Sequence, residues 1–118
     1  MTISREIMEK FNIAFANGDV DFIFESAADN IILNEIGHGT AEGKAAFIEK
    51  MEPMRDYKAD VYKVYRTLID GDTAVVEGEM QFAEEDGQVT YYFNDWYTFK
   101  NEKITNLTAY LIKQKQKK

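Results

Sequence analysis

The sequence predicts an α+β domain in which helices pack on one face of an antiparallel sheet. Two observations lead to this fold class: apolar residues recur at helical spacing up to Pro53, and strand-like segments separated by tight turns follow. The chain has 118 residues, of which 45% are apolar, and this is enough to fill a single core. Residues 1–118 are therefore expected to form one domain without a linker.

The first helix is predicted from apolar residues that recur every fourth position and form one stripe. Ser4 or Thr2 can cap its start, because each offers a side-chain oxygen to the free amides of the first turn. Asn17-Gly18 is typical of a helix end. The stripe consists of Ile3, Ile7, Phe11 and Phe15, with Met8 beside it.

A second, shorter helix is predicted from Asp19, which can cap it, to about Ala27. Its apolar residues are dense, so it is expected to be mostly buried. Residues 30–36 then have the pattern of a strand. Because this strand lies between two helices, it must reach the sheet separately from the others. One face of the strand presents Ile31, Leu33 and Glu35.

A third helix is predicted after the loop at residues 37–40. Thr40 can cap its start, and Pro53 ends it because proline lacks the amide hydrogen that a helix interior needs. The apolar residues of this helix are Ala45, Phe47, Ile48 and Met51.

The second half of the chain predicts four strands joined by tight turns. Tyrosine, β-branched residues and alternating polarity favour strands, and Asp-Gly pairs favour the first two turns between them. The predicted strands cover residues 57–69, 73–83 and 91–99, and a last strand follows the turn at 100–103 and ends at about Ile112. The other turns are expected at 69–73 and 84–88.

Charge and composition limit the partners that this chain is expected to have. A formal charge of −7 and a pI of about 4.7 make nucleic acid an unlikely partner, because nucleic-acid binders usually present a clustered basic face. The one basic cluster, at residues 113–118, is interpreted as a solvated tail, with binding to an anionic surface as the alternative. The first residues carry charges every few positions and lack the apolar run typical of a signal peptide, and no segment approaches the ~20 apolar residues of a membrane span. We expect a cytoplasmic protein.

One carboxylate, Asp95, interrupts an aromatic strand face in the segment YYFNDWYTF. Its charged form would lose hydration there, which favours the neutral acid. Two alternatives stay open: hydrogen-bonding tyrosines could hold the group ionised, or it could be a structural acid bonded to a tyrosine or an amide. The residues that share its face are Val89, Tyr91, Phe93, Tyr97 and Phe99.

The segments AFANGDVDFIFESAADNI and DWYTFKNEKI, in this order, resemble the nuclear transport factor two-like superfamily, particularly its SnoaL-like cyclase and ketosteroid isomerase branches. The resemblance covers nearly the whole chain. It implies a conical fold, with three N-terminal helices in the concave face of a curved, mainly antiparallel sheet and a deep apolar pocket at the open end. It also implies a homodimer joined through the outer sheet face, where Tyr92 and Trp96 are expected to point.

The resemblance also implies a candidate catalytic pair. In the isomerase branch a carboxylate base lies on the first strand, and this position corresponds to Glu35. A neutral carboxylic acid in the oxyanion hole corresponds to Asp95. The position of the family's tyrosine on the first helix is occupied by Phe11, so one hydrogen-bond donor is missing and identical steroid chemistry is not implied. The alternative for Glu35 is a rim residue that faces solvent.

Together, a base and a hydrogen-bond donor suit enolisation next to a carbonyl group. His38 lies between two glycines and could act as a proton shuttle, or it could be an ordinary loop histidine. A single histidine without cysteines gives no metal-ligand spacing, and the chain has no glycine-rich phosphate loop, so no metal or cofactor is expected.

Strand and helix periodicity predict which side chains line the pocket, and their apolar character suits a small hydrophobic or aromatic molecule with a carbonyl or hydroxyl group. The leading hypothesis is a cofactor-independent isomerase or cyclase that uses Glu35 and Asp95. A non-catalytic binding protein and a dimeric interaction module are the alternatives. The predicted lining residues, besides the two acids, are Phe11, Phe15, Leu33, His38, Met80, Phe82, Tyr91, Phe93, Tyr97, Leu107, Ala109 and Leu111.

Overall fold

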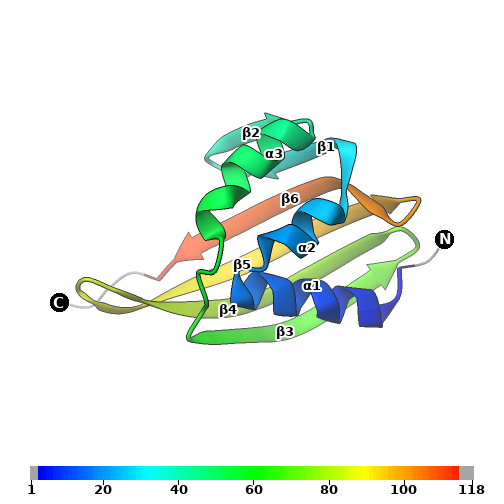
Figure 1. Cartoon of the computed structure of the whole chain (residues 1–118). Helices are drawn as coiled ribbons and strands as arrows, with labels where there is room; N and C mark the ends of the chain where they lie inside the picture. Colours follow the sequence, from blue (N-terminus) through cyan, green and yellow to red (C-terminus); the bar gives the residue numbers. More distant parts are fainter. Residues whose placement is uncertain (1–2, 115–118) are drawn as a thin grey trace.

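The computed structural model describes residues 3–114, and within them three α-helices lie across one face of a six-stranded sheet (Figure 1). The predicted α+β fold class is confirmed. The helices are α1 (Arg5–Asn17), α2 (Val20–Glu25), α3 (Lys44–Met51) and the short 3-10 helix η1 (Glu52–Met54). The strands are β1 (Ala27–Glu35), β2 (Gly39–Glu42), β3 (Val61–Asp70), β4 (Thr73–Glu84), β5 (Gly87–Lys100) and β6 (Lys103–Lys113).

Helix α1 begins and ends where the sequence predicts. Ser4 is the N-cap, and its side-chain oxygen accepts a hydrogen bond of 3.1 Å from the amide of Ile7. The alternative cap, Thr2, lies outside the described residues. Gly18 ends the helix in the left-handed conformation with φ 68°, and a Cβ atom there would lie 2.5 Å from the carbonyl oxygen of Met54. Glycine is therefore needed both for its backbone angle and for close packing.

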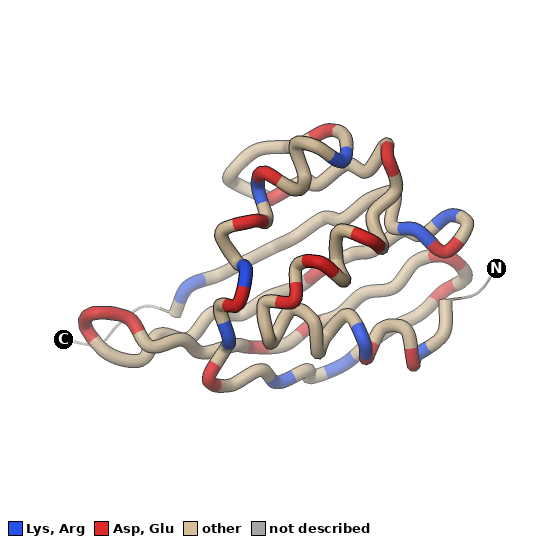
Figure 2. The backbone as a smooth tube through the Cα atoms, viewed as in Figure 1, with Lys and Arg blue, Asp and Glu red and all other residues tan. Residues whose placement is uncertain are grey.

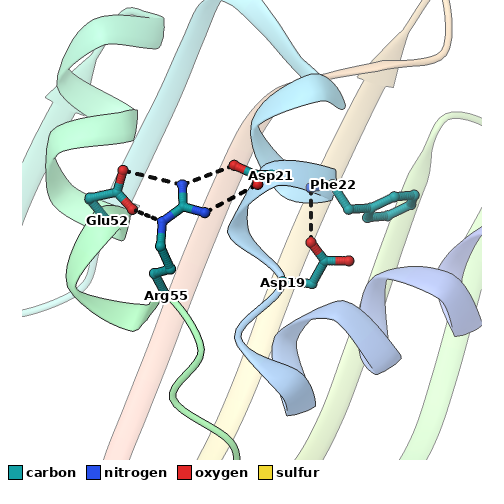
Figure 3. A network of polar contacts seen from close by, with 5 residues as sticks. All are labelled: Asp19, Asp21, Phe22, Glu52 and Arg55. Carbon is teal, nitrogen blue, oxygen red and sulfur yellow. Dashed lines mark hydrogen bonds and ion pairs between the residues drawn. The ribbon is translucent and has the colours of Figure 1, made fainter.

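Helix α2 is capped by Asp19, whose carboxylate accepts a hydrogen bond of 3.3 Å from the amide of Phe22. It ends at Glu25 and not at Ala27, because Ala27 already pairs with Ile104 in the sheet. An arginine on the segment after η1 ties this helix to η1 (Figure 3).

The guanidinium of Arg55 bridges two acids, Asp21 on α2 and Glu52 on η1. Its Nη2 lies 2.9 Å from Asp21 Oδ1, and its Nε lies 2.6 Å from Glu52 Oε2. The hydrogen bonds and the positive charge of Arg55 hold the pKa of Asp21 below its ordinary value. This bridge holds Arg55, the residue after η1, against the start of α2.

The predicted capping of the third helix by Thr40 is wrong. Thr40 lies in β2, a short strand that the sequence analysis did not predict, and pairs with Asn34 of β1. Helix α3 begins later, at Lys44, and its N-cap Gly43 offers no side chain. Pairing of β2 with β1 therefore outweighs the local capping signal. Pro53 does follow the helix, within η1.

The strands form one sheet in the order β2-β1-β6-β5-β4-β3. Strands β3 to β6 follow one another as antiparallel neighbours, as the turn signals predict. Strand β1 reaches the sheet separately and pairs parallel with β6. This parallel pairing places β1 beside β6, next to the centre of the sheet.

An aromatic cluster fills the space between α1 and the sheet. The ring centroid of Phe11 lies 5.2 Å from that of Phe22, 5.9 Å from that of Tyr97 and 5.7 Å from that of Phe99. Aromatic pairs of this kind contribute about 0.5–1.5 kcal/mol each beyond the area they bury. These four residues are called the aromatic cluster below.

Charged residues lie mainly outside the centre of the sheet. Figure 2 shows acidic residues on the helices and at the turn between β4 and β5. Within residues 3–114, no helix is both long and apolar enough to cross a membrane. Lys113 and Gln114 are the described part of the predicted basic tail, and the rest of that tail lies outside the described residues.

Candidate functional site

Glu35 and Asp95 lie in one row that runs across three neighbouring strands. Ala109 on β6 pairs with Glu35 on β1 and with Asp95 on β5. Directly paired residues point to the same face of a sheet, so both carboxyl groups project from the face that α1 covers. Two strand spacings separate them, which gives roughly 10 Å between their Cα atoms. The small side chain of Ala109 leaves the space between them open.

A cavity of about 140 Å³ lies above this row, between the sheet and the helices. Its walls come from strands β1, β3, β4, β5 and β6, from the loop after β1, and from α1, α3 and η1. Most of its surface is apolar, and the two acids are among its few polar groups. The lining residues are Phe15, Leu33, Glu35, Ile36, His38, Met51, Met54, Tyr62, Met80, Phe82, Phe93, Asp95, Leu107, Ala109 and Leu111.

Asp95 lies in apolar surroundings, although the cavity leaves its side chain partly accessible. Burial raises the pKa of Asp95 to about 7, and no hydrogen bond or neighbouring charge contributes to the shift. The carboxyl group is therefore close to half protonated at neutral pH. The alternative that tyrosine hydrogen bonds hold it ionised is wrong, because the shift is upward.

Two tyrosines lie close enough to Asp95 to respond to its charge. Burial, and then the negative charge of Asp95, raise the pKa of Tyr62 above its usual value. Burial, Asp95 and Tyr62 in that order raise the pKa of Tyr97 well above its usual value. Both phenols therefore stay protonated at neutral pH and keep their hydrogen as possible donors.

Tyr62 is a site residue that the sequence analysis missed. It lies on β3 and lines the cavity, and its ring centroid is 5.1 Å from that of Phe93. The sequence carried a signal, because Tyr62 and Val64 lie on either side of Lys63, as expected for a strand with one apolar face. The sequence does not encode the register between β3 and β4. That register pairs Tyr62 with Met80 and so places Tyr62 beside the cavity.

Glu35 lies at the edge of the cavity and pairs with Lys50 of α3. Lys50 Nζ is 3.3 Å from Glu35 Oε1, and the exposed fractions of the two side chains are 48% and 32%. The Oε1 atom is buried, and the geometry of the ion pair is not that of a hydrogen bond. Glu35 is therefore half-buried at the edge of the cavity, beside α3.

Three predicted lining residues lie elsewhere. Phe11 and Tyr97 are almost fully buried in the core, because they lie further along α1 and β5 than the cavity reaches. Tyr91 lies on the same face of β5 as Asp95 but nearer the turn between β4 and β5, where its hydroxyl donates a hydrogen bond of 2.8 Å to Glu84. Periodicity predicts the face of the helix or strand on which a side chain lies. It does not predict how far along the element the cavity extends. The other predicted residues, including His38, line the cavity; the structure adds Ile36, Met51, Met54 and Tyr62.

No group of three or more histidine, aspartate or glutamate side chains within the described part of the chain is arranged to hold a metal ion. The polar groups of the cavity are carboxyl, phenol and imidazole groups, which can exchange protons and hydrogen bonds with a guest.

Comparisons with known proteins identify the family. The family model described as SnoaL-like domain matches residues 8–107. An NTF2-like protein of unknown function from Cytophaga hutchinsonii superposes with a TM-score of 0.77 at 25% identity, covering 89% of this chain and 96% of that one. None of the curated proteins matches the sequence significantly.

Two other similar structures share the fold at lower identity. An LEH-like epoxide hydrolase from M. tuberculosis has a TM-score of 0.70 at 18% identity, covering 89% of this chain and 79% of that one. A provisional ketosteroid isomerase from Kribbella flavida has a TM-score of 0.74 at 13% identity, covering 97% of this chain and 81% of that one. The family match and these structures agree with the observed α+β cone, and the chain belongs to the SnoaL-like domain family.

Proposed function

We propose that this protein binds a small hydrophobic carbonyl compound in the cavity and catalyses proton transfer next to the carbonyl group, as a cofactor-independent isomerase or cyclase. Glu35 is the base and Asp95 is the acid. The observation that carries this proposal is the row Glu35–Ala109–Asp95, which directs two carboxyl groups with different surroundings into one cavity. Groups whose environments differ in this way suit separate acid and base roles.

The proposed step begins with the ionised carboxylate of Glu35, which takes a proton from the carbon next to the carbonyl group. The electron pair of the broken C–H bond forms a C=C bond, and the carbonyl oxygen becomes an enolate. Protonated Asp95 donates a hydrogen bond to that oxygen where its negative charge develops. In an isomerisation of a β,γ-unsaturated ketone the enolate is conjugated with the C=C bond, and Glu35 returns the proton to the γ carbon while the C=O bond forms again. In a cyclisation the enolate carbon bonds to the carbon of a second carbonyl group, the C=O π bond of that group breaks, and its oxygen takes the proton from Glu35.

Tyr62 is a second donor in this proposal. Its hydroxyl stays protonated, it lines the same cavity, and the charge of Asp95 reaches it. Phe11 on α1 has no polar atom and lies in the aromatic cluster, so α1 supplies no donor. The donor that the family places on its first helix would here come from β3. Because the provisional ketosteroid isomerase shares only the fold at 13% identity, these roles rest on the residues of this chain.

Deuterium exchange tests the chemistry without knowledge of the natural substrate. The protein is incubated in D2O with a small cyclic ketone, cyclohex-2-en-1-one, and the loss of the proton signals next to the carbonyl group is followed by NMR. We expect exchange faster than in buffer alone, and loss of that acceleration in Glu35→Gln. Asp95→Leu, which has no polar atom, should slow exchange by about 10²-fold, the scale of losing one donor to a developing oxyanion.

Matched controls separate chemistry from folding. Glu49→Gln changes an exposed acid on α3, and Asp29→Asn changes an exposed acid on β1; neither lines the cavity. Both variants should catalyse deuterium exchange into the ketone at the wild-type rate. Binding without any acceleration of exchange would reject the enzyme and leave the second candidate.

The second candidate is a non-catalytic protein that binds a small apolar metabolite. It is favoured by Phe11, a buried side chain that offers no hydrogen-bond donor at the position where the resemblance to the isomerase branch implies a tyrosine. In this case Glu35→Gln would change affinity for the ketone and nothing else. Native mass spectrometry of the purified protein would detect a bound metabolite directly.

We also propose that two copies associate through the outer face of the sheet. Residues next to Asp95 on β5 point to this opposite face, where Trp96 is 49% exposed and Ile112 of the neighbouring strand is 65% exposed. Tyr92 and Tyr110 extend this apolar surface. Analytical ultracentrifugation should report a dimer for the wild type and a monomer for Trp96→Glu. Ile13→Glu, on the exposed face of α1, should remain a dimer. A monomeric wild type would reject this association.

A further inference from the structure

We infer that the cavity accepts guests of one six-membered ring and rejects fused-ring guests, and that Phe15 sets this limit. The inference rests on the proposed function, because it concerns the same cavity, and it narrows the substrate class to single-ring carbonyl compounds. It depends on three features of the structure: the volume of the cavity, the residues that form its floor, and the position of one phenylalanine.

The first feature is the volume of about 140 Å³. An apolar protein cavity of about 150 Å³ holds one benzene molecule, whereas pockets for drug-sized ligands occupy about 300–1,000 Å³. The cavity therefore has room for one ring and not for two fused rings. A carbonyl oxygen on that ring would be within reach of the polar groups that line the same small space.

The second feature is the row of residues below the Glu35–Asp95 row. Leu107 on β6 pairs with Leu33 on β1 and with Tyr97 on β5, and all three side chains are nearly fully buried. These side chains project to the same face as the two acids, one step closer to the aromatic cluster. They form a floor, so a guest next to Asp95 cannot extend further in this direction.

The third feature is Phe15, which belongs to both the cavity and the core. Its side chain lines the cavity, and its ring centroid lies 6.5 Å from that of Tyr97 in the floor. The ring thus occupies the space that a second ring of a guest would need. Phe11, one turn earlier on α1, is packed within the aromatic cluster and does not line the cavity. Phe15 is the residue of α1 whose truncation would enlarge the cavity.

The remaining walls restrict guests less. Met51, Met54 and Met80 line the cavity, and the unbranched thioether side chain of methionine adapts to differently shaped neighbours. We therefore expect weak discrimination among single-ring compounds that differ in substituents. The number of rings should matter much more, because the floor and Phe15 are held by core packing.

The test measures binding with the methionine methyl groups as reporters. The protein is labelled with 13C at methionine methyls and titrated with cyclohex-2-en-1-one, which has one ring, and with 2-decalone, which has two fused rings. Met51, Met54 and Met80 report the cavity, and the buried Met8, which does not line it, reports the fold. In the wild type we expect the single-ring ketone to bind at least about tenfold more tightly than the fused-ring ketone, a ratio that lies within the range for steric discrimination in a pocket.

The same titration of Phe15→Ala should remove this preference and improve the affinity for 2-decalone by about tenfold. Phe15→Leu, a smaller truncation, should give an intermediate result if the alanine variant folds poorly. Phe24→Ala is the matched control, because Phe24 packs on Phe47, is also half-buried and does not line the cavity. It should keep the wild-type preference.

The outcomes distinguish this inference from the proposed function. Equal or tighter binding of 2-decalone by the wild type would overturn the size limit and leave the ligand site intact. An unchanged preference in both Phe15 variants would overturn the role of Phe15. If neither ketone shifts the signals of the three cavity methionines in any variant, the cavity is not a ligand site for carbonyl compounds. The proposed function and the size limit would then both be rejected.

Discussion

Glu35 and Asp95 flank Ala109 in a single row of the sheet, so two acids that are 60 positions apart in the sequence face one cavity. Parallel pairing of β1 with β6 and antiparallel pairing of β6 with β5 produce this row. The acids differ in their surroundings: Glu35 is paired with Lys50, whereas Asp95 is enclosed by apolar groups that raise its pKa to about 7. The following predictions depend on this arrangement.

Ala109→Leu should block the cavity. The larger side chain would stand between the two carboxyl groups, in the space that a guest would occupy. We expect the affinity for cyclohex-2-en-1-one to fall by at least about tenfold, and the overpacking to cost about 1–3 kcal/mol of stability. Methionine-methyl NMR and urea unfolding measure the two effects. Ala45→Leu on the exposed face of α3 is the control, and unchanged affinity in Ala109→Leu would place the guest elsewhere.

Asp95 should make stability depend on pH. Its pKa is about 7 in the folded protein and 3.8 for the free group, so the folded state binds the extra proton between these values. Stability is therefore fully present below about pH 4, falls as the pH rises toward 7, and then levels off, with a total loss of up to about 4 kcal/mol.

Asp95→Asn should remove this dependence, because an amide does not ionise. Urea unfolding at pH 5 and pH 8 should show that the wild type loses stability relative to the variant at the higher pH. Asp29→Asn, which changes an exposed acid of β1, should follow the wild-type curve. Parallel curves for wild type and Asp95→Asn would show that Asp95 has an ordinary pKa, and its role as a neutral acid would be lost.

Tyr62→Phe should slow ketone exchange without unfolding the protein. The change removes the hydroxyl that lies near Asp95 but keeps the ring, which packs on Phe93. Loss of one donor to a developing oxyanion costs about 10²-fold or more in rate. Tyr91→Phe is the matched control, since its hydroxyl bonds Glu84 outside the cavity. Equal exchange rates in the two variants would mean that Tyr62 does not contact the substrate.

Gly78→Ala should destabilise the sheet behind the cavity. A Cβ atom at Gly78 would collide with the carbonyl oxygen of Lys63 and lie 2.7 Å from Cζ of Phe93, a cavity-lining ring. Backbone on one side and a packed ring on the other cannot both move away, so we expect a loss of about 1–3 kcal/mol.

Gly71→Ala is the comparison for this variant. Gly71 has φ 60°, and its neighbourhood is open. Its substitution should cost only the backbone strain of a left-handed residue, about 1–2 kcal/mol. Urea unfolding measures both variants, and ketone binding should decrease only in Gly78→Ala. Full ketone affinity in that variant would show that the Phe93 wall tolerates displacement.

Local sequence signals were sufficient for much of the fold. Helix α1 begins after Ser4 and ends before Gly18, as predicted, and Asp19 caps α2. These positions could be predicted because helix caps depend on residues within one turn. The strands after Val61 follow the turn signals for the same reason. Strand β2 was missed, since four residues are too few for a period and are defined by their pairing with β1. The false cap at Thr40 has the same cause.

The sequence by itself determined the α+β class, the ends of α1 and the placing of Asp95 on an aromatic face, because helical and strand periods repeat within a few residues. The tertiary structure alone decided that Ala109 stands between the two acids and that Tyr62 joins them. It also decided that Phe11 and Tyr97 lie in the core below the cavity. Register between distant strands and depth along a strand come from packing of the whole chain, and no local period encodes either of them.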